Sequence, residues 1–308
     1  MKRRDLLTFT GMAAFAPLAW AESGLRGTVR IVGSDSLSTA LAVWSQAYRL
    51  RERRVDMEIQ SSGSASGAIA LIQGTADLSP MSRSLTVAEV REFVARYGYR
   101  PSAVEVALDA LTIITAPANA LEKITLIELD QIYGDTRRCS FLPRIERFEQ
   151  LHDGRGNPQR IIPVGRTASS GSYGYFRTSV LCSGRFAAHY RALPGAASVA
   201  FAVARSPAAM GYVGLGFLGA QVKALRVARS AGELAYAPTE ENVLSRRYPL
   251  SRKLKVYFNR APAQALKPAV QDFLQFALSE PGQRIARRCG LIPLPAAVLG
   301  EMRAKIVA

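Results

Sequence analysis

Four short loops rich in serine and glycine carry the residues of this chain that are best suited to bind an anion. Each loop follows an apolar run, and three of them lead into a helical pattern; they are Gly33–Ser36, Ser61–Ser64, Ser79–Ser84 and Arg166–Ser172. The first N–H groups of a helix have no partner within it, and the helix dipole adds positive potential there. Such donors, together with serine hydroxyls, attract phosphate-like groups. The loops therefore predict a binding site for an oxyanion.

The segments around these loops follow an α/β pattern, because strand-like apolar runs alternate with helix-like ones. The chain has 308 residues, and the roughly 287 that remain without a leader exceed one hydrophobic core, which predicts two lobes. No repeat or low-complexity linker divides the chain, so we expect it to cross between the lobes more than once. Predicted strands are 29–32, 55–59, 111–115, 161–164, 210–213 and 254–258, and predicted helices are 37–49, 66–73, 87–97, 126–133, 172–181 and 268–278.

The N-terminus has the pattern of a secretory signal. Three basic residues at 2–4 precede the apolar stretch 6–20, and Ala19 and Ala21 provide the small residues that signal peptidase reads. We predict a cleaved signal peptide over residues 1–21. Its paired arginines also resemble a twin-arginine signal, although the usual Phe and the preceding Ser or Thr are absent. An uncleaved membrane anchor is the alternative, but the stretch is shorter than the roughly 20 apolar residues that span a bilayer.

The charge balance is strongly basic. Without residues 1–21 the chain holds 37 Lys and Arg against 23 Asp and Glu, which is a formal charge of +14. Such a field draws small anions toward a cleft and could also hold the protein near an anionic membrane or a nucleic acid. The basic residues are scattered rather than gathered in a run or an aromatic-interleaved stripe. We therefore expect a solvated basic surface and no nucleic-acid partner.

Cysteine and histidine support few functions. The three cysteines allow at most one internal disulfide and one free thiol in an oxidising compartment, and we expect Cys139 to pair with Cys182. The two histidines, His152 and His189, lack partners at metal-ligand spacing, and no CxxC occurs. We therefore expect no metal site and no cofactor.

Enzyme motifs are poorly matched. Gly63–Gly67 places Ala where the hydrolase motif G-x-S-x-G needs its nucleophile. Gly214–Gly219 fits G-x-G-x-x-G, but residues 221–226 match a dinucleotide-binding helix poorly. No G-K-[ST] phosphate loop occurs, so ATP hydrolysis would belong to a separate subunit. We expect that the protein is not an enzyme.

Short motifs follow one another in a specific order along nearly the whole mature chain. They are 61–69, 74–77, 82–85, 108–111, Asn119 with 124–126, Leu129 and 131–133, Arg166 with 170–172, 210–213, 248–252 and 278–283. In this order the chain resembles the periplasmic phosphate-binding proteins of ABC transporters. Each motif alone is a weak signal, whereas the ordered set is specific.

The resemblance implies a fold and a function. The fold is the α/β, two-lobed type II periplasmic binding protein fold, which holds its ligand in a cleft between the lobes and closes on it. Lobe I would comprise residues 25–112 and 250–308, and lobe II residues 113–249. The function would be capture of inorganic phosphate in the periplasm by a monomer that delivers it to an ABC permease in the inner membrane.

The resemblance also places the ligand contacts in the serine-rich loops. Arg166 would supply charge, because its planar guanidinium can form two parallel hydrogen bonds to a tetrahedral oxyanion. Serine hydroxyls and neighbouring N–H groups would add donors without charge. Each serine alone could be an ordinary N-cap or turn residue. The expected contacts besides Arg166 are Ser34, Asp35, Ser36, Ser62, Gly63, Ser64, Ser82, Arg83, Ser170, Gly171 and Ser172.

Two acids of well-known phosphate binders are missing here. Ser82 and Ala168 stand where those proteins have Asp. In the family the first acid accepts the proton that phosphate carries, and the second holds the arginine in place. A carboxylate acceptor rejects sulfate, which has no proton to offer. Asp35 is the only acid in the four loops and thus the candidate acceptor, unless it serves as an N-cap.

These departures keep two alternatives open beside phosphate capture. The chain could bind sulfate, arsenate or another tetrahedral oxyanion. It could also be an accessory sensor or interaction protein on the same fold, with weak or no phosphate binding. A secreted phosphatase would need residues that turn over a phosphomonoester, and the sequence offers none.

Overall fold

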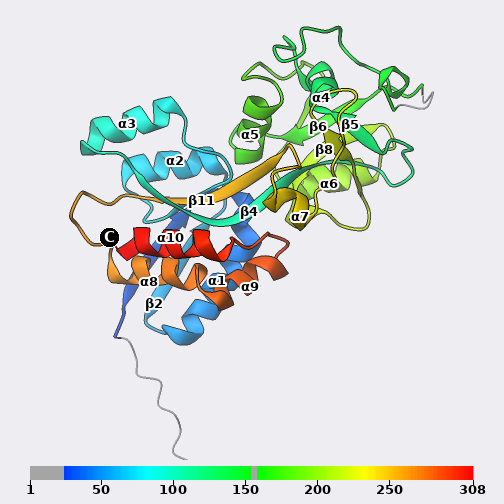
Figure 1. Ribbon diagram of the computed structural model, residues 1–308. Helices are drawn as coiled ribbons and strands as arrows, with labels where there is room; N and C mark the ends of the chain where they lie inside the picture. The colour runs from blue at the N-terminus through cyan, green and yellow to red at the C-terminus, as the bar shows by residue number, and fades with distance from the viewer. Residues whose placement is uncertain (1–23, 154–157, 308) are drawn as a thin grey trace, which may run out of the picture.

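The computed structural model describes residues 24–153 and 158–307, and it consists of two lobes that long strands connect (Figure 1). The predicted signal peptide at residues 1–21 lies outside the described residues. Within those two ranges, no helix is long and apolar enough to cross a membrane.

Lobe I is built from the N-terminal and C-terminal parts of the described chain. Strands β1 (Gly27–Val32) and β2 (Val55–Gln60) pair in parallel, and Val32 N–H donates to Leu78 O just before β3 (Ser79–Met81). The helices of this lobe are α1 (Ser38–Arg51), α2 (Ser64–Gln73), α3 (Val87–Tyr97), α8 (Pro268–Ala277), α9 (Glu280–Arg288) and α10 (Ala296–Val307). Figure 1 shows α2 and α3 on one side of the lobe and α1, α8, α9 and α10 on the other.

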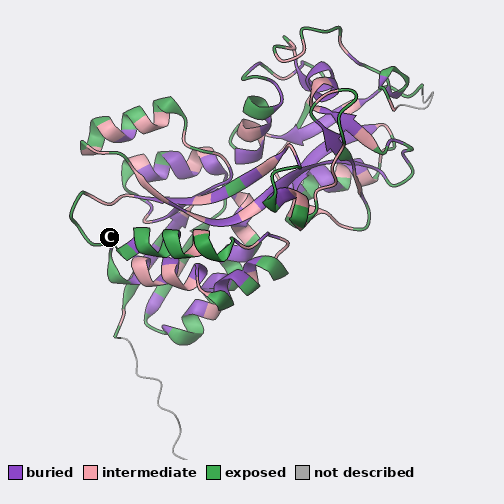
Figure 2. Ribbon diagram, in the orientation of Figure 1, coloured by how far each residue is buried: buried purple, intermediate pink, exposed green. Residues whose placement is uncertain are grey.

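The apolar faces of these helices form the core of lobe I. Trp44 and Tyr48 are buried one turn apart on α1, and Phe273 and Leu274 are buried on α8. Residues three to four positions apart share one face of a helix, so this face packs inward while the opposite face meets solvent. Figure 2 shows the same pattern, with buried strands and helices that are exposed on their outer sides.

One strand belongs to both lobes. The first part of β4 (Ser102–Thr115), residues 102–110, pairs antiparallel with β11 (Ser251–Phe258), and its last part, residues 111–115, pairs with β8 (Ala209–Gly214). Its buried side chains change cores at the same place, from the lobe I cluster up to position 107 to the lobe II cluster from position 110. The chain therefore crosses between the lobes along β4 and returns at β11.

Lobe II contains a buried central strand with helices around it. β8 is buried along its whole length, pairs with β4 on one side and runs parallel to β6 on the other. The other strands are β5 (Lys123–Thr125), β6 (Ile162–Arg166), β7 (Arg191–Leu193), β9 (Lys223–Ala224) and β10 (Arg226–Ala228), and the helices are α4 (Leu126–Tyr133), α5 (Gly171–Ser179), α6 (Ala196–Ala204) and α7 (Glu240–Leu244). Three short 3-10 helices complete the described elements: η1 (Asp35–Leu37), η2 (Phe148–Gln150) and η3 (Leu215–Phe217).

A disulfide joins two loops of lobe II. Cys139 and Cys182 are bonded, with their Cα atoms 5.3 Å apart, and Cys289 is a free thiol. The expected pairing is therefore confirmed.

The elements expected from the sequence are present, with differences at their ends. The bounds of α3 and α4 agree with the prediction, because each helix begins with a capping box, Thr86 with Glu89 and Thr125 with Glu128. β4 begins nine residues before the predicted strand at 111–115. The part that was not predicted, residues 102–110, carries Glu105 and Asp109, and these charges interrupt the apolar run that predicts a strand. The predicted lobe boundaries at 112 and 250 remain a prediction.

Candidate functional site

The four serine-rich loops meet between the two lobes. Within lobe I, Ser34 N–H donates to Pro80 O at 2.7 Å and Gly63 N–H donates to Gly33 O at 2.8 Å. Across the lobes, Ala65 N–H donates to Ser169 O at 3.1 Å. Three loops of lobe I thus contact one another, and one of them contacts the loop that leads into α5 of lobe II.

Glycines allow the loops to approach this closely. A Cβ on Gly171, the first residue of α5, would lie 2.2 Å from Ser64 Oγ and 2.3 Å from Ser82 Oγ. A Cβ on Gly63 would lie 2.5 Å from Ser169 O, and the φ of +109° at Gly63 also favours glycine. The start of α5 therefore faces the hydroxyls of lobe I directly.

The hydroxyls of lobe I form a buried hydrogen-bonded group. Ser34 Oγ and Ser82 Oγ lie 2.9 Å apart, and Ser82 N–H donates to Ser64 Oγ at 3.2 Å. Ser36 N–H donates to Ser34 Oγ at 3.2 Å, which makes Ser34 the N-cap of η1. Ser34, Ser64 and Ser82 are fully buried. On the opposite side Ser170 caps α5 by accepting from Ser172 N–H at 3.1 Å.

Arg166 extends from lobe II to Asp35 of lobe I. Arg166 is 3% exposed, its Nη1 lies 2.6 Å from Asp35 Oδ2, and its Nη2 donates to Pro194 O at 2.8 Å. The contact with Asp35 is an ion pair without the alignment of a hydrogen bond. Among the described residues, Arg166 Nε and Nη1 and Asp35 Oδ1 have no hydrogen-bond partner. Leaving buried donors and acceptors unsatisfied costs free energy, so these three atoms mark a candidate ligand site.

Two tyrosines hold the backbone of Arg166. Arg166 N–H donates to Tyr212 Oη at 3.2 Å, and Tyr190 Oη donates to Arg166 O at 2.7 Å. The two hydroxyls lie 2.7 Å apart. Burial raises the pKa of both tyrosines well above the ordinary range, so they remain neutral at physiological pH. The two tyrosines thus hold the backbone of Arg166 in place without adding charge.

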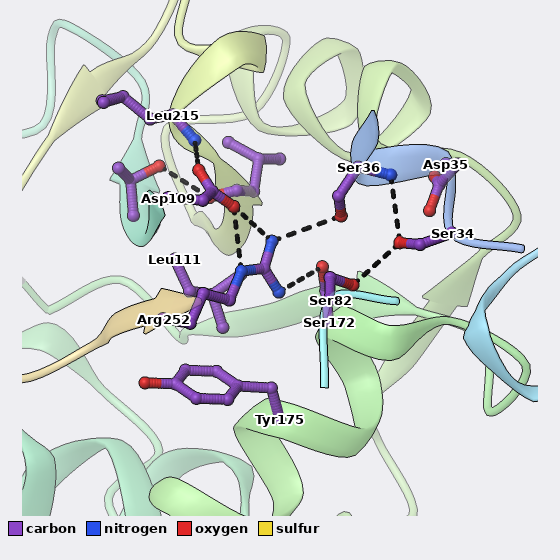
Figure 3. A network of polar contacts seen from close by, with 12 residues as sticks. Ser34, Asp35, Ser36, Ser82, Asp109, Leu111, Ser172, Tyr175, Leu215 and Arg252 are labelled. Atoms are coloured by element: carbon purple, nitrogen blue, oxygen red, sulfur yellow. Dashed lines mark hydrogen bonds and ion pairs between the residues drawn. The ribbon is translucent and has the colours of Figure 1, made fainter. Parts of the chain in front are cut away.

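A second arginine, Arg252, lies beside these loops (Figure 3). Its Nε and Nη2 both donate to Asp109 Oδ2, at 2.8 and 2.6 Å. Nη1 donates to Ser172 Oγ at 3.0 Å, and Nη2 also donates to Ser36 Oγ at 3.3 Å. Asp109 Oδ1 accepts from Leu215 N–H at 2.9 Å. Arg252 therefore contacts expected ligand residues from both lobes.

The structure brings most of the expected contacts together but places two of them differently. Arg83 donates to both carboxylate oxygens of Glu89, at 2.7 and 2.6 Å, and its side chain packs against Gly174 of α5. Its guanidinium is thus engaged away from the serine hydroxyls. Ser62 is exposed, and Ser64 is the hydroxyl of that loop that enters the site.

The sequence reasoning missed Asp109 and Arg252 as site residues. Both lie within matched motifs, 108–111 and 248–252; Asp109 stands in a mostly apolar strand, and Arg252 alternates with the apolar residues Leu254 and Val256 of β11. A charge at a buried strand position requires a partner. That signal could have pointed to the pair.

Clusters of metal-ligating side chains are absent from the described part of the chain. No group of three or more His, Cys, Asp or Glu side chains in it is arranged to hold a metal ion. The polar atoms at the site are donors for an anion, with a single acceptor at Asp35 Oδ1 left open.

These observations describe a two-lobed protein with a candidate anion-binding site between the lobes. A model of the PBP superfamily domain matches residues 19–281, so the chain belongs to this family and has its two-lobed type II periplasmic binding fold. It is 38% identical to the phosphate-binding protein PstS of Pseudomonas aeruginosa over 279 residues, which cover 90% of this chain and 86% of that protein. The family is one of ligand-binding proteins rather than enzymes.

Solved structures support the same fold. One is a candidate phosphate ABC transporter substrate-binding protein from Clostridium perfringens with bound phosphate, with a TM-score of 0.73 and 25% identity over 87% of this chain and 100% of that one. An ABC-type phosphate transport receptor from Vibrio cholerae aligns with a TM-score of 0.68 and 24% identity, over 87% of this chain and 100% of that one.

Proposed function

We propose that this protein captures inorganic phosphate between its lobes in the periplasm and delivers it to an ABC permease for import. One observation carries the proposal: Arg166 is buried with its Nε and Nη1 unsatisfied, beside buried serine hydroxyls and the start of α5. A tetrahedral oxyanion offers acceptors for a guanidinium and for surrounding donors at once. The named relative from Pseudomonas aeruginosa is a phosphate-binding protein, which favours phosphate among the oxyanions.

Asp35 deepens the proposal, because it favours a ligand that carries a proton. Its Oδ2 pairs with Arg166, and its Oδ1 is buried and unsatisfied in the described residues. A carboxylate oxygen can only accept. Phosphate at neutral pH carries at least one proton that it can donate, whereas sulfate carries none and would place an acceptor against an acceptor. Asp35 would thus combine the roles of the two acids that are missing at positions 82 and 168.

The remaining parts of the proposal concern location and partners. The predicted signal peptide and the relatives' role in ABC transport support export to the periplasm and docking on a permease of the inner membrane. We infer that the protein acts as a monomer, since its ligand contacts come from the two lobes of one chain.

Calorimetric titration of the mature, phosphate-stripped protein tests the proposal. Phosphate should bind tightly, arsenate should compete with it, and sulfate at the same pH should give no heat. Tight sulfate binding would instead favour an oxyanion receptor that does not require a protonated ligand. Silence with all three anions would contradict ligand capture and favour the accessory sensor or interaction protein on this fold.

A further inference from the structure

One guanidinium reaches hydroxyls on both sides of the cleft. Arg252 Nη1 donates to Ser172 Oγ in the first turn of α5, and its Nη2 donates to Ser36 Oγ in η1 of lobe I. The two hydroxyls come from opposite lobes and belong to loops that face the anion site. Figure 3 shows Arg252 between Asp109 on one side and these serines on the other.

The chemistry of arginine decides how these hydroxyls are oriented. A guanidinium has five N–H donors and no acceptor. Each serine oxygen must therefore accept from Arg252, and its own proton remains free to donate elsewhere. Within the described residues, neither Ser36 Oγ nor Ser172 Oγ donates to a protein acceptor. Accepting from a charged donor also makes a hydroxyl a stronger donor.

Arg252 itself is held by protein partners, and its charge is balanced by Asp109. Asp109 lies directly opposite Arg252 in the antiparallel pairing of β4 with β11, and both side chains are 1% exposed. The ring of Tyr175 lies over the guanidinium, with its centroid 5.7 Å from Cζ. Every nitrogen of the guanidinium has an acceptor, and a Cβ on Gly214 would lie only 3.3 Å from Nη2. The position of Arg252 is therefore set by the strands that join the lobes.

We propose that Arg252 is a positioning residue for the anion site. Held by Asp109, it presents the protons of Ser36 and Ser172 to the ligand, one from each lobe, and it links the two hydroxyls only when the lobes are closed. This role rests on the proposed function, because the ligand that receives these protons is phosphate. Without Arg252, each hydroxyl can rotate, and binding must then meet the cost of ordering it.

The test is a double-mutant cycle between Arg252 and Ser172, read by calorimetric titration with inorganic phosphate. R252K keeps a positive charge beside Asp109 but cannot reach both serines. We expect R252K and S172A each to weaken phosphate binding by about 10- to 100-fold, as for lost charged and buried hydrogen bonds. The double variant should bind phosphate only slightly less tightly than the single variant with the larger loss of affinity, because the hydroxyl of Ser172 depends on Arg252.

Controls separate positioning from folding. R287K changes an exposed arginine that pairs with Glu240, and its phosphate affinity should equal that of the wild type. Thermal unfolding without phosphate shows whether R252K is folded. If R252K fails to fold, S36A, S172A and their double variant replace it. These two serines do not contact each other, so strong coupling between their losses of phosphate affinity supports a link through Arg252. Independent losses of affinity overturn the proposal.

Three results would contradict the proposal in distinct ways. Unchanged affinity in a folded R252K protein overturns the role of Arg252, and so do losses that multiply in the R252K/S172A variant. In both cases the wild-type protein still binds phosphate, and the proposed function stands. Absence of phosphate binding by the wild-type protein overturns the proposed function and this role together.

Discussion

Two arginine–aspartate pairs in the described part of the chain, Arg166–Asp35 and Arg252–Asp109, differ in how fully their polar atoms are hydrogen-bonded. In the pair Arg166–Asp35, two donors of the guanidinium and one carboxylate oxygen are unsatisfied in the described residues. In the pair Arg252–Asp109, every nitrogen of the guanidinium and both carboxylate oxygens have partners. Residue type alone would not separate the two pairs. The unsatisfied polar atoms favour Arg166 as the ligand-binding arginine, whereas the satisfied ones agree with the supporting role that we propose for Arg252.

The two pairs also differ in what holds them together. Asp109 and Arg252 face each other on neighbouring strands of one sheet, so their contact does not depend on the cleft. Asp35 and Arg166 come from different lobes, and Asp35 is 17% exposed. Their contact therefore depends on closure of the lobes. A permanent pair can position the site, whereas a pair between lobes can respond to the ligand.

Removing Asp109 should have the largest effect. D109A leaves Arg252 as a buried charge without its partner, which costs about 3–5 kcal/mol of unfolding free energy. Urea denaturation without phosphate measures this loss. D35A is the matched control. Because water reaches Arg166 when the lobes open, D35A should lose less unfolding free energy than D109A. A larger loss in D35A than in D109A would reverse the comparison.

Removing Arg166 should affect binding more than folding. R166A removes the charge that faces the ligand and should weaken phosphate binding by about 2–5 kcal/mol. Calorimetric titration gives the affinity, and urea denaturation should show a smaller loss of stability than D109A does. Wild-type affinity in R166A would place the ligand elsewhere.

Changing Asp35 should alter selectivity. D35N replaces the acceptor by an amide that can donate to an unprotonated oxygen, so the preference for phosphate over sulfate should narrow by about 1–3 kcal/mol. Parallel titrations with both anions at one pH measure the change. D56N removes a negative charge from the exposed surface of β2 and serves as the control. An equal gain in sulfate binding by D56N would show a general effect of charge.

The smallest effect on stability is expected for a third arginine, Arg83, which donates hydrogen bonds to Glu89 and points away from the serine hydroxyls. Although burial opposes it, hydrogen bonds from Arg83 and Thr86 lower the pKa of Glu89 below its ordinary value. The contacts of Glu89 therefore stabilise the folded protein fully at pH values above the unfolded carboxyl pKa of about 4.3. This stabilisation is lost as the pH falls through the lower pKa that Glu89 has in the folded protein. Denaturation at several pH values should show wild type more stable than E89Q at pH 7, with the difference closing in acid. A difference in stability between the wild type and E89Q that stays constant with pH would show that packing, and not the charge of Glu89, causes it.

Much of the fold could be predicted because its signals are local. Capping boxes at Thr86 and Thr125 set the starts of α3 and α4, and apolar runs located the longer strands but not the five strands of two or three residues. Residues 102–110 of β4 were not predicted as a strand, since Glu105 and Asp109 interrupt the apolar pattern there. Asp109 belongs in a strand only because β11 brings Arg252 opposite it, and that pairing joins residues 143 positions apart.

The amino-acid sequence by itself determined which polar groups are available: donors from serines and glycines at the ends of strands and from Arg166 before a helix, and Asp35 as the single acid among them. Their residue types and the helix starts that follow them act over a few residues, so they can be read without a structure. Only the tertiary structure decided which of these groups meet. It paired Asp35 with Arg166, turned Arg83 toward Glu89 and placed Arg252 behind two serines, because contacts between lobes and the register of β4 with β11 join distant parts of the chain.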